Sequence, residues 1–130
     1  MTERPFNRID TVFLPVRDLE AAAVWYARNL GLEEIYREHG IVVLNAGETP
    51  LTLLRHRWPG LTEVPEDEVF EPVKQPTFNF FAPDIRAAHE KLKSAGARVS
   101  EIRDHGTVRE FRFEDPDGNV VGVCWWGESG

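Results

Sequence analysis

The chain has 130 residues, 42% of them hydrophobic and 28% charged, which predicts one globular domain over residues 1–130 and excludes a disordered chain. Its formal net charge of −7 disfavours nucleic acid as a partner. The longest apolar run, residues 120–126, is too short to span a bilayer, the N-terminal residues lack a signal peptide's apolar core, and the single cysteine excludes an internal disulfide. We therefore expect a cytoplasmic protein without a membrane partner.

The first half of the chain predicts one βαβββ module over residues 7–57. An apolar run at residues 9–16 predicts a strand, Asp18 is placed to cap a helix, and Gly31 to end it. Three further strands are predicted at residues 33–37, 41–45 and 51–56, with turns between them.

The second half repeats this pattern over residues 77–126. The segment that begins at Asp84 matches the segment that begins at Asp18, 66 residues earlier, which indicates an internal duplication. Strands are predicted at residues 77–82, 98–103, 107–114 and 119–126. A proline-rich linker over residues 58–76 joins the two modules. The predicted fold class is α+β, with two curled mixed sheets around a concave cavity and the helices outside.

Three sequence features together resemble a known family: the paired modules, the phrase Leu14-Pro15-Val16-Arg17-Asp18-Leu19, and the segment Phe113-Glu114-Asp115-Pro116-Asp117-Gly118-Asn119 before the last strand. They look like the vicinal oxygen chelate (VOC) superfamily, also called the glyoxalase / bleomycin resistance protein / dioxygenase superfamily. The resemblance covers nearly the whole chain. It implies two half-barrels that enclose a cavity, and it leaves the function open because this fold carries several enzymes and drug-sequestering proteins.

The family's divalent metal has four ligands, usually His, Gln or Glu, on the first and last strands of each module. By position from the helix-opening aspartates and from Gly118, the resemblance places these ligands at Thr11, Thr52, Thr77 and Gly122. Neutral hydroxyls and a glycine are poor ligands for a divalent cation. We therefore expect no metal at these positions and no cofactor, which puts in doubt every activity that needs the metal as a Lewis acid.

Strand alternation predicts which other side chains share the cavity, because every second residue faces the same way. This gives an apolar and aromatic pocket that suits a flat or cationic organic molecule. The predicted cavity residues are Thr11, Phe13, Thr52, Leu54, His56, Trp58, Thr77, Asn79, Phe81, Glu110, Arg112, Gly122, Cys124 and Trp126.

Several of these residues also have a simpler interpretation. His56, between two arginines, fits a solvated strand end as well as a base or relocated ligand. Glu110 and Arg112 fit either an ion pair on the pocket wall or a solvated strand face. For Cys124 a buried apolar role is favoured over a nucleophile, because no sequence neighbour would lower the pKa of its thiol.

Three functions remain open from the sequence. The first is a metal-independent protein that binds a small aromatic or cationic organic molecule. The second is an enzyme of lyase, isomerase or dioxygenase type that works without the usual metal or with one moved to His56, Asp10, Glu110 or His105. The third is a non-catalytic structural module with a filled cavity. The family resemblance and the open sheet edges also favour a homodimer.

Overall fold

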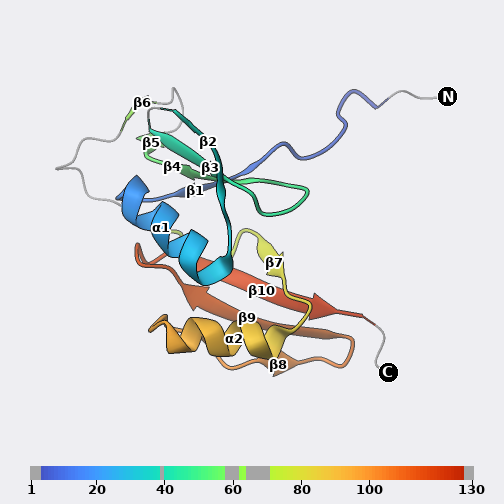
Figure 1. Cartoon of the computed structure of the whole chain (residues 1–130). Helices are drawn as coiled ribbons and strands as arrows, with labels where there is room; N and C mark the ends of the chain where they lie inside the picture. The colour runs from blue at the N-terminus through green and yellow to red at the C-terminus, as the bar shows by residue number, and fades with distance from the viewer. Residues whose placement is uncertain (1–3, 39, 58–61, 64–70, 128–130) are drawn as a thin grey trace.

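The structure is a computed structural model that describes residues 4–38, 40–57, 62–63 and 71–127, with the backbone alone at residues 56–57 and 62–63. Figure 1 shows two modules, each a four-stranded sheet with one helix. The predicted pair of βαβββ modules and the α+β class are confirmed.

The first module is built from β1, α1, β2, β3 and β4 in chain order. β1 and β4 are parallel neighbours, and β3 pairs antiparallel with both β4 and β2, so the strand order is β1-β4-β3-β2. The elements are β1 (Val12–Pro15), α1 (Leu19–Leu30), β2 (Glu34–Glu38), β3 (Ile41–Leu44) and β4 (Leu51–Leu54).

The second module repeats this arrangement with the order β7-β10-β9-β8, again with one parallel pair, β7 and β10. Its elements are β7 (Asn79–Phe81), α2 (Ile85–Ser94), β8 (Arg103–Asp104), β9 (Val108–Glu114) and β10 (Val120–Trp126). Between the modules, β5 (His56–Arg57) pairs antiparallel with β6 (Thr62–Glu63).

Two strands of the second module are shorter than the sequence predicts. β7 begins at Asn79 and not at Thr77. Instead of a strand over residues 98–103 there is an isolated bridge from Val99 to Phe113, followed by the two-residue β8. The backbone N–H of Arg112 donates to the side-chain oxygen of Ser100, 2.9 Å away. The Ser100 hydroxyl thus takes the place of a backbone carbonyl as the acceptor for Arg112. This substitution interrupts the strand pairing.

Local capping defines both helices. The carboxylates of Asp18 and Asp84 each accept a hydrogen bond from the backbone N–H three residues later, at 3.1 and 3.0 Å. Past the helix ends, Gly31 and Gly96 have φ of 73° and 88°, which glycine adopts without steric cost. Both caps follow from short-range sequence, which explains why the helices were predictable.

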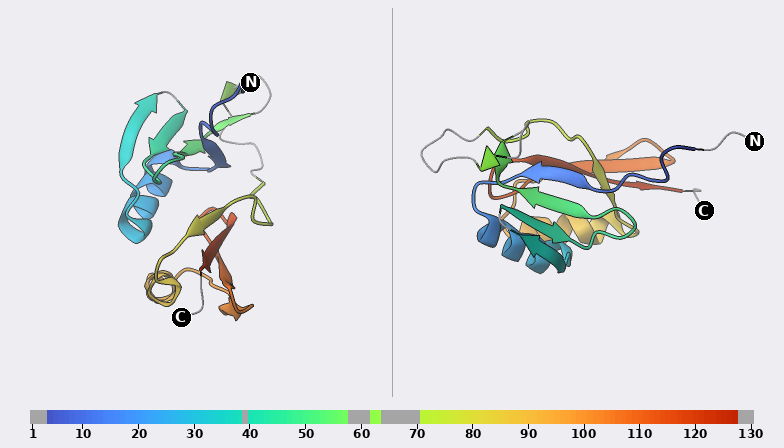
Figure 2. Two further views of the ribbon diagram at one scale, coloured as in Figure 1. Left: turned by 90° about the vertical axis from the view of Figure 1, so that its right-hand side faces the viewer. Right: turned by 90° about the horizontal axis from the view of Figure 1, so that it is seen from above.

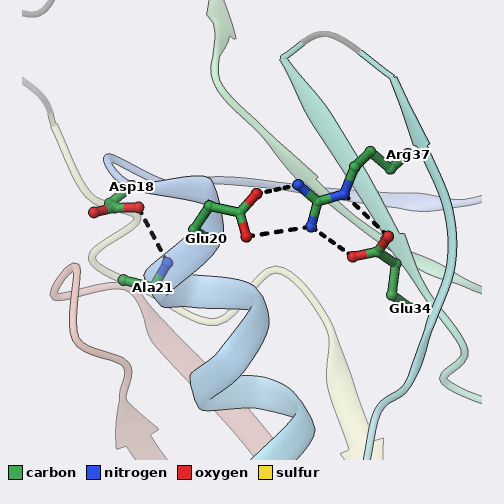
Figure 3. A network of polar contacts seen from close by, with 5 residues as sticks. All are labelled: Asp18, Glu20, Ala21, Glu34 and Arg37. Carbon is green, nitrogen blue, oxygen red and sulfur yellow. Dashed lines mark hydrogen bonds and ion pairs between the residues drawn. The ribbon is translucent and has the colours of Figure 1, made fainter.

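An ion-pair network joins the start of α1 to β2 (Figure 3). The guanidinium group of Arg37 contacts Glu20 of α1 and Glu34 of β2, with Nε of Arg37 donating to Oε2 of Glu34 at 3.0 Å. These side chains are solvent-exposed, so screening limits the contribution of the network to stability. It links the first turn of α1 to the edge strand β2.

The two helices lie on the same side of the two sheets (Figure 2). The strand residues that alternate with the predicted cavity residues are buried there, among them Leu14, Val16, Val121 and Val123. They form one hydrophobic cluster with Tyr26 and residues from both modules. In the part of the chain that the structure describes, neither helix is long and apolar enough to cross a membrane.

A buried hydrogen-bond network around Asp115, here called the Asp115 network, joins the two modules. The Asp115 carboxylate, 5% exposed, accepts hydrogen bonds from the Tyr26 hydroxyl at 2.9 Å, from the Asn119 amide at 3.1 Å, and from the backbone N–H groups of Asp117 and Asn119, both at 2.9 Å. The Asn119 amide also donates to the backbone carbonyl of Pro15 at 2.7 Å. The turn before the last strand thus connects α1 and the end of β1 to β9 and β10.

Burial dominates the electrostatics of this network. Desolvation, followed by the charge of Asp115, raises the pKa of Tyr26 well above its usual value. The Tyr26 hydroxyl therefore keeps its proton and acts as a donor to the carboxylate.

Candidate functional site

The faces of the two sheets opposite the helices carry most of the predicted site residues, and we call them the open faces. On the first sheet, strand register places Phe13 beside Thr52. The hydroxyls of Thr11 and Thr52 are 2.7 Å apart and hydrogen-bonded, and Thr11 also donates to the backbone carbonyl of Pro50 at 3.0 Å. Thr52 is only 3% exposed, so its hydroxyl is satisfied within the protein.

On the second sheet, Asn79 lies beside Gly122. A Cβ atom built on Gly122 would lie 1.9 Å from Oδ1 of Asn79. The Asn79 amide therefore occupies the space that a side chain at position 122 would need. Thr77 lies two residues before β7 and is exposed, outside the paired strands.

These side chains do not fit the metal centre that the family resemblance implies. Thr11 and Thr52 use their hydroxyls on each other and on a backbone carbonyl, and Gly122 offers no donor. Divalent transition metals in proteins are held chiefly by imidazole, carboxylate or thiolate ligands. Throughout the described ranges, no group of three or more His, Cys, Asp or Glu side chains is placed to hold a metal ion.

Aromatic side chains are prominent on the open faces. Phe81 of β7 and Trp126 of β10 pack edge to face, with ring centroids 5.4 Å apart and an interplanar angle of 66°. They are 49% and 62% exposed, and Phe13 is 48% exposed. Large aromatic groups this accessible are able to stack on a flat ligand.

A row of three side chains crosses the second sheet next to this pair. Register places Cys124 directly between Phe81 on β7 and Glu110 on β9. Burial of the thiol, and then the charge of Glu110, raise the pKa of Cys124 above its usual value. Cys124 is therefore mainly a protonated thiol at neutral pH.

The next row places Arg112 opposite Gly122. The predicted ion pair between Glu110 and Arg112 does not form among the described residues. Instead, Arg98 lies 3.4 Å from the carboxylate of Glu114, farther along the same strand.

Register also reveals open-face residues that the sequence analysis did not select. Val43 pairs with Thr52, and Tyr36 pairs with Val43, so both continue the row that starts at Phe13. On the second sheet, Arg103 of β8 lies opposite Glu110. Parity within each strand could have suggested Val43 and Tyr36, but the register shift between Glu34 and Tyr36 is not visible in the sequence.

The remaining predicted site residues are buried, exposed away from the two sheets, or outside the described part. Leu54 is on the same strand as Thr52 and is buried. His56 lies in β5, where only the backbone is described, and Trp58 is outside the described residues. Of the alternative ligands, Asp10 pairs with Arg8 at 3.3 Å, and His105 is exposed beside β8.

A crevice of about 180 Å³ lies between the modules, lined by Asn79 and Phe81 together with residues of β1, β4 and the loop before β4. Its volume is below the few hundred Å³ of a typical pocket for a drug-sized ligand. Phe81, which lines this crevice, is half-exposed and continues into the aromatic pair with Trp126.

The sequence profile of the Glyoxalase/Bleomycin resistance protein/Dioxygenase superfamily matches residues 8–123. The chain belongs to this superfamily. No curated protein gives a significant match to the chain.

Solved structures with the same fold as this chain belong to proteins of different kinds. A putative glyoxalase family protein from Bacillus anthracis has a TM-score of 0.76 and 20% identity, covering 97% of this chain and 100% of that one. TnmS3, an antibiotic-binding protein from Streptomyces sp. CB03234, has a TM-score of 0.77 and 21% identity, covering 96% and 100%. Lactoylglutathione lyase from Agrobacterium tumefaciens has a TM-score of 0.71 and 22% identity, covering 94% and 96%. At these identities the likeness shows the fold alone.

Proposed function

We propose that this protein binds a small aromatic or cationic organic molecule on its open faces, without the divalent metal of its superfamily. The half-exposed pair of Phe81 and Trp126 carries the proposal. An edge-to-face pair offers both a ring face and a ring edge to a flat ligand, and burial of that ligand removes apolar surface from water.

Two further observations support a binding role. The antibiotic-binding protein TnmS3 has the same fold, so this scaffold accommodates binding of an organic molecule. The Asn79 amide beside Gly122 and the exposed Thr77 hydroxyl suit hydrogen bonds to a neutral polar group better than they suit a cation with two charges.

We also propose that the binding site is completed in a homodimer. The open faces have no helical cover in the described part of the chain (Figure 2), and β1, β2, β7 and β8 are edge strands of their sheets. Exposed apolar surface and unpaired edges favour association with a second copy. Sedimentation equilibrium should give twice the 14.9 kDa chain mass, and a mass near one chain would contradict the dimer.

Cys124 provides a direct test of ligand binding. It is the only cysteine of the chain and lies beside Phe81, so a ligand stacked on the aromatic pair should slow its alkylation. The probes are N-methylquinolinium and 1-methylnaphthalene, two fused-ring molecules of matched shape. We expect saturable protection of Cys124 by at least one of them.

Matched variants locate the site. Trp126→Ala should abolish the protection, whereas Val24→Ala, which removes an exposed apolar side chain from α1, should leave it intact. Absence of protection by both probes in the folded wild-type protein would refute the binding proposal. Stoichiometric metal in the purified protein, measured by elemental analysis, would refute its metal-independent part.

A further inference from the structure

The carboxylate of Glu110 stands out among the acidic groups of the second sheet. It is half-buried on the open face of β9, two strands away from Phe81, with Cys124 of β10 between them. Within the described ranges it makes no hydrogen bond or ion pair, although Arg103 lies opposite on β8. A partly desolvated carboxylate without a counter-ion favours the approach of a cation.

Neighbouring acidic groups on the same sheet are already paired. Glu114, four residues along β9, lies 3.4 Å from Arg98, and Asp104 of β8 lies 3.3 Å from Arg109. Glu110 is therefore the acidic side chain of this row that is available to an incoming ligand.

The positions of the charges also define an orientation for that ligand. Arg112 lies one row farther from Trp126, opposite Gly122, and it disfavours positive charge at that end. The ring faces of Phe81 and Trp126 lie toward the other end, where the carboxylate of Glu110 shares a row with Phe81 and with Arg103 of the edge strand β8. Ring faces and a carboxylate attract the same kind of ligand, an organic cation.

We propose that this surface selects planar aromatic cations, with the positive charge held by Glu110 and the ring stacked on Phe81 and Trp126. This inference rests on the proposed binding function and adds the charge of the ligand and the residue that recognises it. It assigns Glu110 the role of a binding residue that sets specificity.

The experiment compares N-methylquinolinium with 1-methylnaphthalene, which have the same shape and differ in charge. The wild-type protein should bind the cation more tightly. Glu110→Gln should weaken binding of the cation about fivefold, as for loss of a partly screened ion pair, and leave binding of the neutral probe unchanged. Glu114→Gln, on the same strand and face, should change neither.

A second measurement tests the placement of Glu110 without any ligand. Because the Glu110 charge raises the pKa of the Cys124 thiol, Glu110→Gln should lower that pKa and speed alkylation of Cys124 by iodoacetamide at pH 8. Glu114→Gln should leave the rate unchanged, and thermal melting of each variant confirms its folding. An unchanged rate in Glu110→Gln would overturn the inferred position of its charge.

The outcomes separate this inference from the function on which it rests. Equal binding of both probes, with no effect of Glu110→Gln, overturns the charge selectivity and leaves the binding function standing. Failure of both probes to protect Cys124 overturns the binding function and the selectivity together.

Discussion

Removal of one hydroxyl should measure the strength of the connection between the two modules. Tyr26 is fully buried and donates to the buried Asp115 carboxylate at 2.9 Å. The variant Tyr26→Phe keeps the ring and its packing, and it removes one of four donors to the carboxylate. A hydrogen bond to a charged group contributes about 2 kcal/mol, so the free energy of unfolding should fall by about this amount.

The corresponding change in melting temperature follows from the size of the chain. Unfolding entropy is about 2.1 cal/mol/K per residue near 60 °C, which gives about 0.27 kcal/mol/K for 130 residues. A loss of about 2 kcal/mol should therefore lower the melting temperature by roughly 7 °C.

A second tyrosine provides the matched control. The hydroxyl of Tyr36 also donates to a carboxylate, that of Glu38, but both lie on the exposed strand β2. Tyr36→Phe should therefore change the stability by less than about 0.5 kcal/mol. Urea unfolding followed by circular dichroism measures both variants. Equal, small effects of the two substitutions would refute the assignment of the Asp115 network as a main connection between the modules.

Two further predictions concern titration and close packing. The pKa of Tyr26 is raised in the folded state, so the unfolded chain loses this proton first as the pH rises through about 10. This difference favours the unfolded state. The free energy of unfolding of the wild type should therefore fall by up to about 1.4 kcal/mol per pH unit from this group. Urea titrations at pH 9 and pH 11 should show a smaller loss in Tyr26→Phe, and an equal loss would contradict the raised pKa. Gly122→Ala should displace the Asn79 side chain, which lies 1.9 Å from the new Cβ, and cost less than about 1 kcal/mol because Asn79 is exposed and free to rotate. In an Asn79→Ala background the same substitution should cost nothing measurable, and an additive double-mutant cycle would show that the two side chains do not compete for space.

The sequence was most informative where structure depends on near neighbours. The caps at Asp18 and Asp84 form bonds three residues away, and residues that alternate with the predicted cavity residues, such as Leu14 and Val121, lie in the core. Both patterns depend only on backbone periodicity, so no knowledge of distant contacts was needed.

Features that depend on distant contacts were not predictable. The segment around Asp115 was a marker of the family resemblance, but the sequence does not show that its carboxylate bonds to Tyr26, 89 residues earlier. Strand register places the Asn79 side chain directly over Gly122. Register also sets the position of Tyr36 on the open face. The sequence thus predicted which residues face outward from each strand but not which of them meet.

The Asp115 network also has a consequence for synthesis of the chain. When the ribosome has released only the first module, the Tyr26 hydroxyl and the Pro15 carbonyl have no partner, because Asp115 and Asn119 are not yet made. A nascent first half must leave these groups hydrated, which opposes tight packing of α1 on its own sheet. These last contacts of the N-terminal half therefore form only after the hairpin that carries Asp115 and Asn119 has been made, so the first module is completed by residues translated long after it.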